Sequence, residues 1–123
     1  MASILVADDD AHIVRVLAIW LQRNGHRVMT ARNGREALEL IETNDVDLVI
    51  SDMNMPILDG AGLAEALRKG IGADMPILLL TARCDHAAMR EKLAPLNVSI
   101  FPKPFLPSQL VAEVDRRLGS PIR

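Results

Sequence analysis

The sequence predicts an α/β protein with a five-stranded parallel sheet that carries helices on both faces. Short apolar runs alternate five times with stretches whose apolar residues recur at helical spacing. Strands that alternate with helices pair in parallel through right-handed crossovers. The chain has 123 residues, half of them hydrophobic, which predicts a single domain over residues 1–123 with a sizeable core.

The predicted strands differ in polarity. The first and the third are runs of branched apolar residues, typical of strands that are buried in a parallel sheet, and Pro76 introduces an equally apolar fourth. The second strand is shorter and carries polar residues, as an edge strand should. In chain order the strands are expected at residues 3–7, 26–31, 48–52, 77–80 and 98–101.

A predicted helix follows each strand, and the helix ends carry recognisable signals. Asp10 is an N-cap residue, Asn24 with Gly25 ends a helix, and Pro95 breaks the weakest of the five helices. In chain order the helices are expected between Asp10 and Asn24, from Asn33 through Asn44, from Gly60 to Gly70, at about 85–93, and from Leu110 to Leu118, before Gly119 and Pro121.

Polar side chains that suit a binding site follow four of the five strands. Asp8 and Asp9 follow the first strand, Asp52 ends the third, Thr81 follows the fourth and Lys103 follows the fifth. The carboxyl ends of parallel strands meet at one edge of the sheet, where folds of this kind bind their ligands. We therefore expect these five residues to form one site.

The residue types favour a hard cation and phosphoryl transfer. Carboxylates held close together raise each other's pKa unless a cation intervenes, and oxygen ligands without His or Cys suit Mg²⁺. A metal beside a nucleophilic carboxylate, a lysine and a hydroxyl is suited to moving a phosphoryl group. The carboxylates do not alternate along one loop, which disfavours a Ca²⁺ site, and the sequence contains neither a P-loop nor a G-x-G-x-x-G pattern.

On five segments the chain resembles the receiver domain of two-component response regulators, and the resemblance spans essentially the whole sequence. The segments are Ile-Leu-Val-Ala-Asp-Asp-Asp at 4–10, Asp-Met-Asn-Met-Pro at 52–56, Leu-Asp-Gly at 58–60, Leu-Thr-Ala at 80–82 and Lys-Pro-Phe at 103–105. The resemblance implies a flavodoxin-like sheet with strand order 2-1-3-4-5. It also implies a signalling phosphoacceptor that catalyses only its own phosphorylation and dephosphorylation.

The resemblance assigns a role to each site residue. Asp52 would accept the phosphoryl group from a partner histidine kinase or histidine phosphotransfer protein. Mg²⁺ would be bound by Asp9, Asp52 and the backbone carbonyl of Asn54, with Asp8 acting through water. Thr81 and Lys103 would contact the phosphoryl oxygens, and the Lys103–Pro104 bond would be cis.

Two features depart from the pattern of the family. The position three before the lysine usually carries Tyr or Phe, and here it is Ile100. The segment 93–97 carries Pro95 in place of the usual glycine-containing helix exit. Both lie on the face that the family commonly uses to signal, so we expect phosphorylation to be retained and the usual output switch to be altered.

Two other functions are weighed against this one. A haloacid dehalogenase-type phosphatase normally has a second acid two residues after the nucleophile, and here that residue is Asn54. A flavodoxin-like electron carrier needs a Ser/Thr/Gly-rich phosphate loop after the first strand, where this chain has acids. Both are disfavoured on these grounds.

Composition narrows the partners and the location. A net charge of −2 and three aromatic residues argue against direct nucleic-acid binding. The absence of a signal peptide and of an apolar run of about 18 residues predicts a cytoplasmic protein without a membrane partner. No output domain follows Arg123, so we expect either a stand-alone receiver with a downstream effector or a receiver cut from a longer chain.

The remaining polar and aromatic residues are expected to have structural roles. Asp10 and Asp59 each precede a helix, where a carboxylate meets free N–H groups. Trp20 lies on the apolar stripe of the first helix and should pack in the core, and Cys84 has no partner cysteine. The histidines are expected at the surface: His12, His26 and His86.

Overall fold

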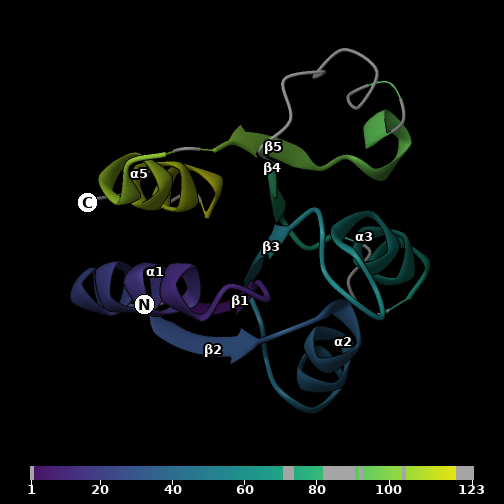
Figure 1. Ribbon diagram of the computed structural model, residues 1–123, viewed down its shortest axis with the longest axis horizontal. Helices are drawn as coiled ribbons and strands as arrows, with labels where there is room; N and C mark the ends of the chain where they lie inside the picture. Colours follow the sequence, from purple (N-terminus) through teal and green to yellow (C-terminus); the bar gives the residue numbers. More distant parts are fainter. Residues whose placement is uncertain (1, 71–73, 82–90, 92, 104, 119–123) are drawn as a thin grey trace.

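The computed structural model describes residues 2–70, 74–81, 91, 93–103 and 105–118. The sheet forms the middle of three layers, with helices on both sides (Figure 1). Its five strands are parallel and lie in the order β2-β1-β3-β4-β5, which confirms the predicted fold class and strand order. The strands are β1 (Ser3–Ala7), β2 (Arg27–Ala31), β3 (Leu48–Asp52), β4 (Ile77–Thr81) and β5 (Ser99–Pro102).

Four α-helices and one 3₁₀ turn occur among the described residues. They are α1 (Ala11–Arg23), α2 (Gly34–Thr43), α3 (Gly60–Lys69), η1 (Ala94–Leu96) and α5 (Pro107–Arg117). The helix predicted at 85–93 lies outside the described residues except for positions 91 and 93, as do Cys84, His86, Pro104 and the segment 119–123. None of the helices that the structure describes is long and apolar enough to cross a membrane.

Three of these helices begin at a side-chain cap. Asp10, Asn33 and Asp59 each accept a hydrogen bond at 2.8–2.9 Å from a backbone N–H two or three residues further on. Asp10 and Asp59 are therefore helix caps, as predicted. The fourth helix, α5, begins after Leu106 without a side-chain cap.

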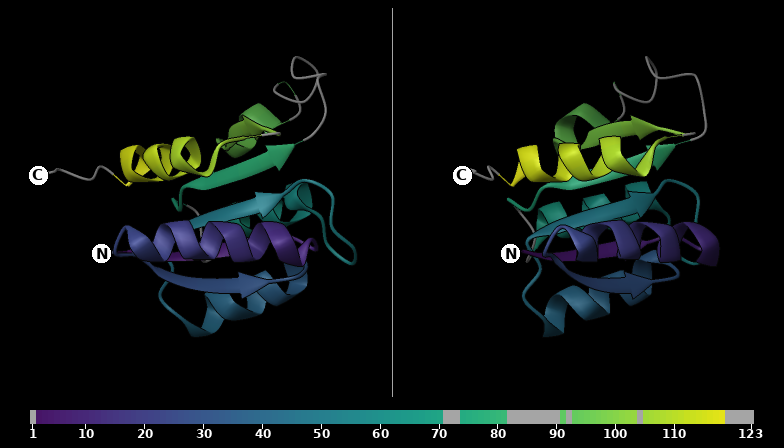
Figure 2. Two further views of the ribbon diagram at one scale, coloured as in Figure 1. Left: turned by 60° about the vertical axis from the view of Figure 1, so that its left-hand side comes forward. Right: turned by 90° about the vertical axis from the view of Figure 1, so that its left-hand side faces the viewer.

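The sheet is buried on both faces, which explains its apolar strands. Leu5 and Leu79 pack with α2 and α3, whereas Ile50 and Leu78 pack with α1 and α5. Figure 2 shows α1 and α5 side by side over one face. Each buried Leu or Ile contributes about 1.5–3 kcal/mol to folding, and this core holds the ends of the strands in place.

Two side chains differ from the prediction. Trp20 is 38% exposed and is not a core residue, because Leu17 and Leu21 occupy the inward side of α1. His26 is not a surface residue, because its side chain is only 9% exposed. Its Nε2 lies 2.9 Å from Oδ1 of Asp115 on α5, a partner 89 positions away in the sequence.

Candidate functional site

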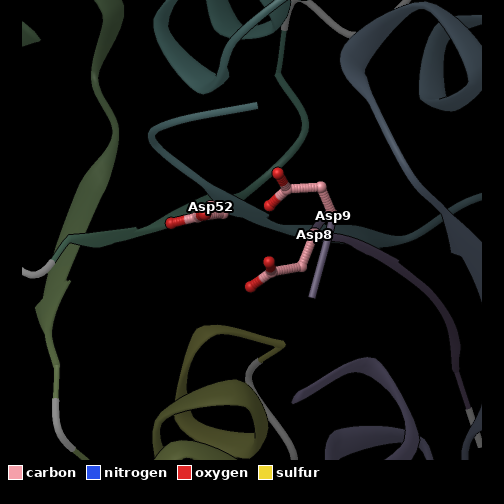
Figure 3. Close-up of side chains that lie close together, drawn as sticks. All are labelled: Asp8, Asp9 and Asp52. Atoms are coloured by element: carbon pink, nitrogen blue, oxygen red, sulfur yellow. The ribbon is translucent and has the colours of Figure 1, made fainter. Parts of the chain in front are cut away.

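Three carboxylates converge at the carboxyl ends of two neighbouring strands. Asp8 and Asp9 follow β1, and Asp52 is the last residue of β3, which pairs with β1 (Figure 3). One oxygen from each of the three carboxylates lies within 4.8 Å of the others. Asp8 and Asp52 are buried, and Asp9 is exposed. The sequence therefore brings together at one edge the acids that it predicts there.

Lys103 supplies positive charge to this cluster. Its Nζ lies 3.2 Å from Oδ1 of Asp52 and 3.6 Å from Oδ2 of Asp8. The backbone N–H of Lys103 donates to the carbonyl oxygen of Thr81 at 2.7 Å, which fixes the end of β5 against β4. One ammonium thus faces two buried carboxylates and a third nearby.

The electrostatics of Asp8 show that this balance is incomplete. Burial raises the pKa of the Asp8 carboxyl above its ordinary value. A hydrogen bond from the backbone N–H of Asp10 to Oδ1 opposes the rise, repulsion from Asp52 adds to it, and Lys103 lowers it again. Within the described part of the chain, the buried Oδ2 of Asp8 receives no hydrogen bond. A buried, unsatisfied oxygen among carboxylates is the donor chemistry of a hard divalent cation, and these residues fit one.

Thr81 and Asn54 lie at the same edge of the sheet. Asp52 pairs in register with Leu80, so that the fully buried Thr81 stands one residue further along the neighbouring strand. Asn54 is exposed in the loop that follows β3. The predicted phosphoacceptor, metal and phosphoryl-binding residues therefore come from the ends of β1, β3, β4 and β5 or from the adjoining loop.

The loop after β3 is held by a close contact that the sequence analysis did not predict. The N–H of Gly34 donates to the carbonyl oxygen of Leu58 at 2.9 Å, and a Cβ at position 34 would lie 2.6 Å from that oxygen. A Cβ at Gly60 would lie 2.5 Å from the carbonyl oxygen of Asp52. Only glycine permits these approaches. In the sequence, the glycines at the starts of α2 and α3 were the signal that could have indicated these close approaches.

The same loop contains a strained residue. Ile57 has φ 70° and is 75% exposed, and the N–H of Leu58 donates to the carbonyl oxygen of Pro56 at 2.7 Å. This is a γ-turn of the rare positive-φ type, which is unfavourable for a β-branched residue. The turn directs Leu58 toward Gly34 and leaves Ile57 in solvent.

A groove next to Lys103 is also new. It has a volume of about 470 Å³ and lies between α1 and the segment that leads from β5 into α5. Ile13 and Val16 line it on one side, and Phe105 and Pro107 on the other. Ile100, the atypical position, is half-buried and packs on the opposite face of the sheet, with the α2–α3 cluster.

Known proteins resemble the chain over nearly its whole length. The family model for the response regulator receiver domain matches residues 4–115. Response regulator MprA of Mycolicibacterium vanbaalenii is 41% identical over 114 residues, which cover 90% of this chain and 48% of that protein. The receiver domain of the Francisella response regulator 1452 superimposes with a TM-score of 0.88 at 32% identity, covering 97% of this chain and 98% of that one.

A second solved structure agrees. The Vibrio cholerae chemotaxis protein CheY4 gives a TM-score of 0.87 at 32% identity, with coverage of 94% of this chain and 98% of that one. The chain spans about half the length of the curated relatives that it matches. The strand order, the acidic edge and these matches agree, and the chain belongs to the receiver domain family of response regulators.

Proposed function

We propose that this chain is the phosphoacceptor domain of a two-component phosphorelay and that Asp52 is the residue that accepts the phosphoryl group. The observation that carries the proposal is the position of Asp52. It ends a buried strand with Lys103 Nζ 3.2 Å from one oxygen and two further carboxylates within 4.8 Å. Asp52 thus combines a nucleophilic carboxylate with a neighbouring positive charge and a place in a candidate cation site.

Asp8, Asp9 and Asp52 would hold Mg²⁺, together with the backbone carbonyl of Asn54, and Asp8 would act through water. The unsatisfied oxygen of Asp8 and the all-oxygen donor set support this assignment. When bound, the ion supplies charge neutralisation to the phosphoryl oxygens.

The protein's own residues would position the transfer. A carboxylate oxygen of Asp52 forms a bond to phosphorus while the bond from phosphorus to the donor's histidine nitrogen breaks, and that nitrogen keeps the electron pair. Lys103 pairs with one phosphoryl oxygen, and the Thr81 hydroxyl donates to another. The later hydrolysis of the acyl phosphate by water returns Asp52 to a carboxylate.

The donor would be a histidine kinase or a histidine phosphotransfer protein in the cytoplasm. The apolar groove beside Lys103 supports the docking of a protein donor rather than of a small phosphoester, because it offers apolar side chains within reach of the acidic edge. Residues 1–123 would act as one domain. Its output would pass to a downstream effector or to an output domain of a longer chain.

Phosphotransfer from a purified histidine kinase in Mg²⁺ tests the proposal. Intact-protein mass spectrometry should show one added phosphoryl group on the wild type and none on Asp52→Asn, which keeps the shape but lacks the nucleophilic oxygen. Asp59→Asn, a cap residue on the same loop, is the matched control and should be phosphorylated normally. Labelling of Asp52→Asn at another residue would refute the assignment, and steady phosphate release from small phosphoesters would favour a phosphatase.

A further inference from the structure

Lys103 lies just after β5, in the short stretch of chain that leads into α5. Its backbone N–H is tied to Thr81 at the end of β5. At the other end, the carbonyl oxygen of Leu106 accepts hydrogen bonds from the N–H groups of Gln109 and Leu110 at 3.0 and 3.2 Å, and α5 begins after Leu106 without a side-chain cap. The backbone is thus fixed on both sides of Lys103, and apolar contacts of Phe105 add a further restraint near the ammonium.

Phe105 is the next described residue after Lys103 and lines the same groove. Its ring lies 6.0 Å from the ring of Phe101, centroid to centroid, at an interplanar angle of 67°, an edge-to-face pair that fixes relative orientation. Both rings pack on the cluster between the sheet and α1 with α5. Phe101 belongs to β5, so the pair joins the segment after Lys103 to the sheet before it.

The surrounding space makes this contact decisive for the position of Lys103. Phe105 and Lys103 both line the 470 Å³ groove, on the side facing Ile13 and Val16. If the Phe105 ring is removed, the chain can move into that space because no close-packed wall opposes it. A shift of the segment would carry the ammonium away from Asp52 and Asp8, which it now approaches to 3.2 and 3.6 Å.

We propose that Phe105 is a positioning residue for Lys103: the edge-to-face pair with Phe101 holds the ammonium against the acidic cluster. The proposal rests on the proposed function, since it concerns how the site receives a cation and a phosphoryl group. It differs from a packing role in one respect. Loss of packing weakens the binding of every ligand. Displacement of a positive charge instead changes the affinities for cations and for anions in opposite directions.

The test is a pair of binding measurements on Phe105→Ala and the milder Phe105→Leu, at neutral pH. Mg²⁺ binding is measured by isothermal titration calorimetry, and beryllofluoride binding is measured by NMR at saturating Mg²⁺. With Lys103 displaced, we expect Phe105→Ala to bind Mg²⁺ about threefold more tightly and beryllofluoride about tenfold more weakly, because the ammonium repels the first and attracts the second. Phe105→Leu should change both affinities in the same directions as Phe105→Ala, by smaller factors.

Further variants distinguish a displacement of Lys103 from a general loss of packing. Lys103→Ala should show the same opposite signs, and Phe105→Ala added to Lys103→Ala should change neither affinity further, because Phe105 acts through Lys103. Leu118→Ala, which removes a half-buried side chain from the same apolar cluster beyond the far end of α5, is the control and should leave both affinities within about twofold.

The outcomes distinguish this inference from the proposed function. A wild type that binds neither Mg²⁺ nor beryllofluoride contradicts the proposed function and this inference with it. A wild type that binds both, with a Phe105→Leu variant that weakens both or changes neither, refutes the positioning role and leaves the function standing. Full additivity of Phe105→Ala and Lys103→Ala also refutes it.

Discussion

Replacing Asp8 by Asn should stabilise the metal-free protein. With an effective dielectric constant of about 20, Lys103 at 3.6 Å attracts Asp8 by about 5 kcal/mol, and Asp9 and Asp52, at up to 4.8 Å, each repel it by about 3–4 kcal/mol. Solvent screens the exposed Asp9, so the net repulsion is at most about 1 kcal/mol. Burial of the charge adds to this, and Asn keeps the oxygen that accepts the Asp10 N–H.

We therefore expect the free energy of unfolding of Asp8→Asn to exceed that of the wild type by about 2 kcal/mol at pH 7 in the presence of a metal chelator. This difference corresponds to a rise of about 5–10 °C in melting temperature. The assay is urea unfolding followed by the fluorescence of Trp20, with thermal melts beside it. Asp10→Asn is the matched control, because Asn serves equally well as an N-cap and the exposed site should change little. An Asp8→Asn variant that is no more stable than the wild type would refute the electrostatic account.

The pH dependence gives the same prediction a second test. The pKa of Asp8 is raised in the folded protein from its ordinary value of 3.8, so the folded protein binds more protons than the unfolded chain between that value and the higher folded-state pKa. Wild-type stability should fall as pH rises through this window, and the difference from Asp8→Asn should vanish below it. Mg²⁺ should reverse the ranking at pH 7, because it binds the wild type more strongly and stabilises it by RT ln(1 + [Mg²⁺]/Kd).

Three further predictions concern the loop after β3 and the β5 strand. Gly34→Ala should cost about 2–3 kcal/mol of stability in urea unfolding, because its Cβ would press on the Leu58 carbonyl, and a cost below 0.5 kcal/mol would mean that the loop yields. Ile57→Gly should raise stability by about 1 kcal/mol, since it relieves the positive φ at an exposed position, and a destabilised variant would contradict the strain. Beryllofluoride should shift the NMR signals of the residues that follow Asp52 and Thr81. The shifts near η1 should stay small, because the Ile100 side chain is stiff at χ1. A large two-state shift near η1 in the wild type that Ile100→Tyr does not increase would contradict this.

Sequence patterns predicted what depends on local chemistry. The apolar runs of β1, β3 and β4 and the caps Asp10 and Asp59 follow from spacing and residue type, and the structure contains them. The strand exits then place Asp8 and Asp52 together because both strands are parallel and adjacent. The strand order itself came from the family resemblance, since periodicity does not say which strands are neighbours.

Features that depend on distant partners were not predicted. The burial of His26 requires Asp115 on α5, and the environment of Leu58 requires Gly34 at the start of α2. Trp20 has the spacing of a core residue, but Leu17 and Leu21 occupy the inward positions. In each case the outcome depends on a tertiary contact that local sequence patterns do not encode.

The acidic edge destabilises the metal-free protein, whereas the apolar strands beneath it stabilise the fold. The strands that carry Asp8 and Asp52 are among the most buried parts of the chain, so the fold can hold like charges close together at their ends. Burial, with repulsion from Asp52, raises the pKa of Asp8 despite Lys103, and its Oδ2 receives no hydrogen bond from the described residues. A substitution that removes the repulsion should therefore stabilise the protein and weaken its attraction for a cation at the same time. The instability of the metal-free site is thus the same free energy that cation binding would recover, and the apolar core beneath it is what allows the fold to maintain it.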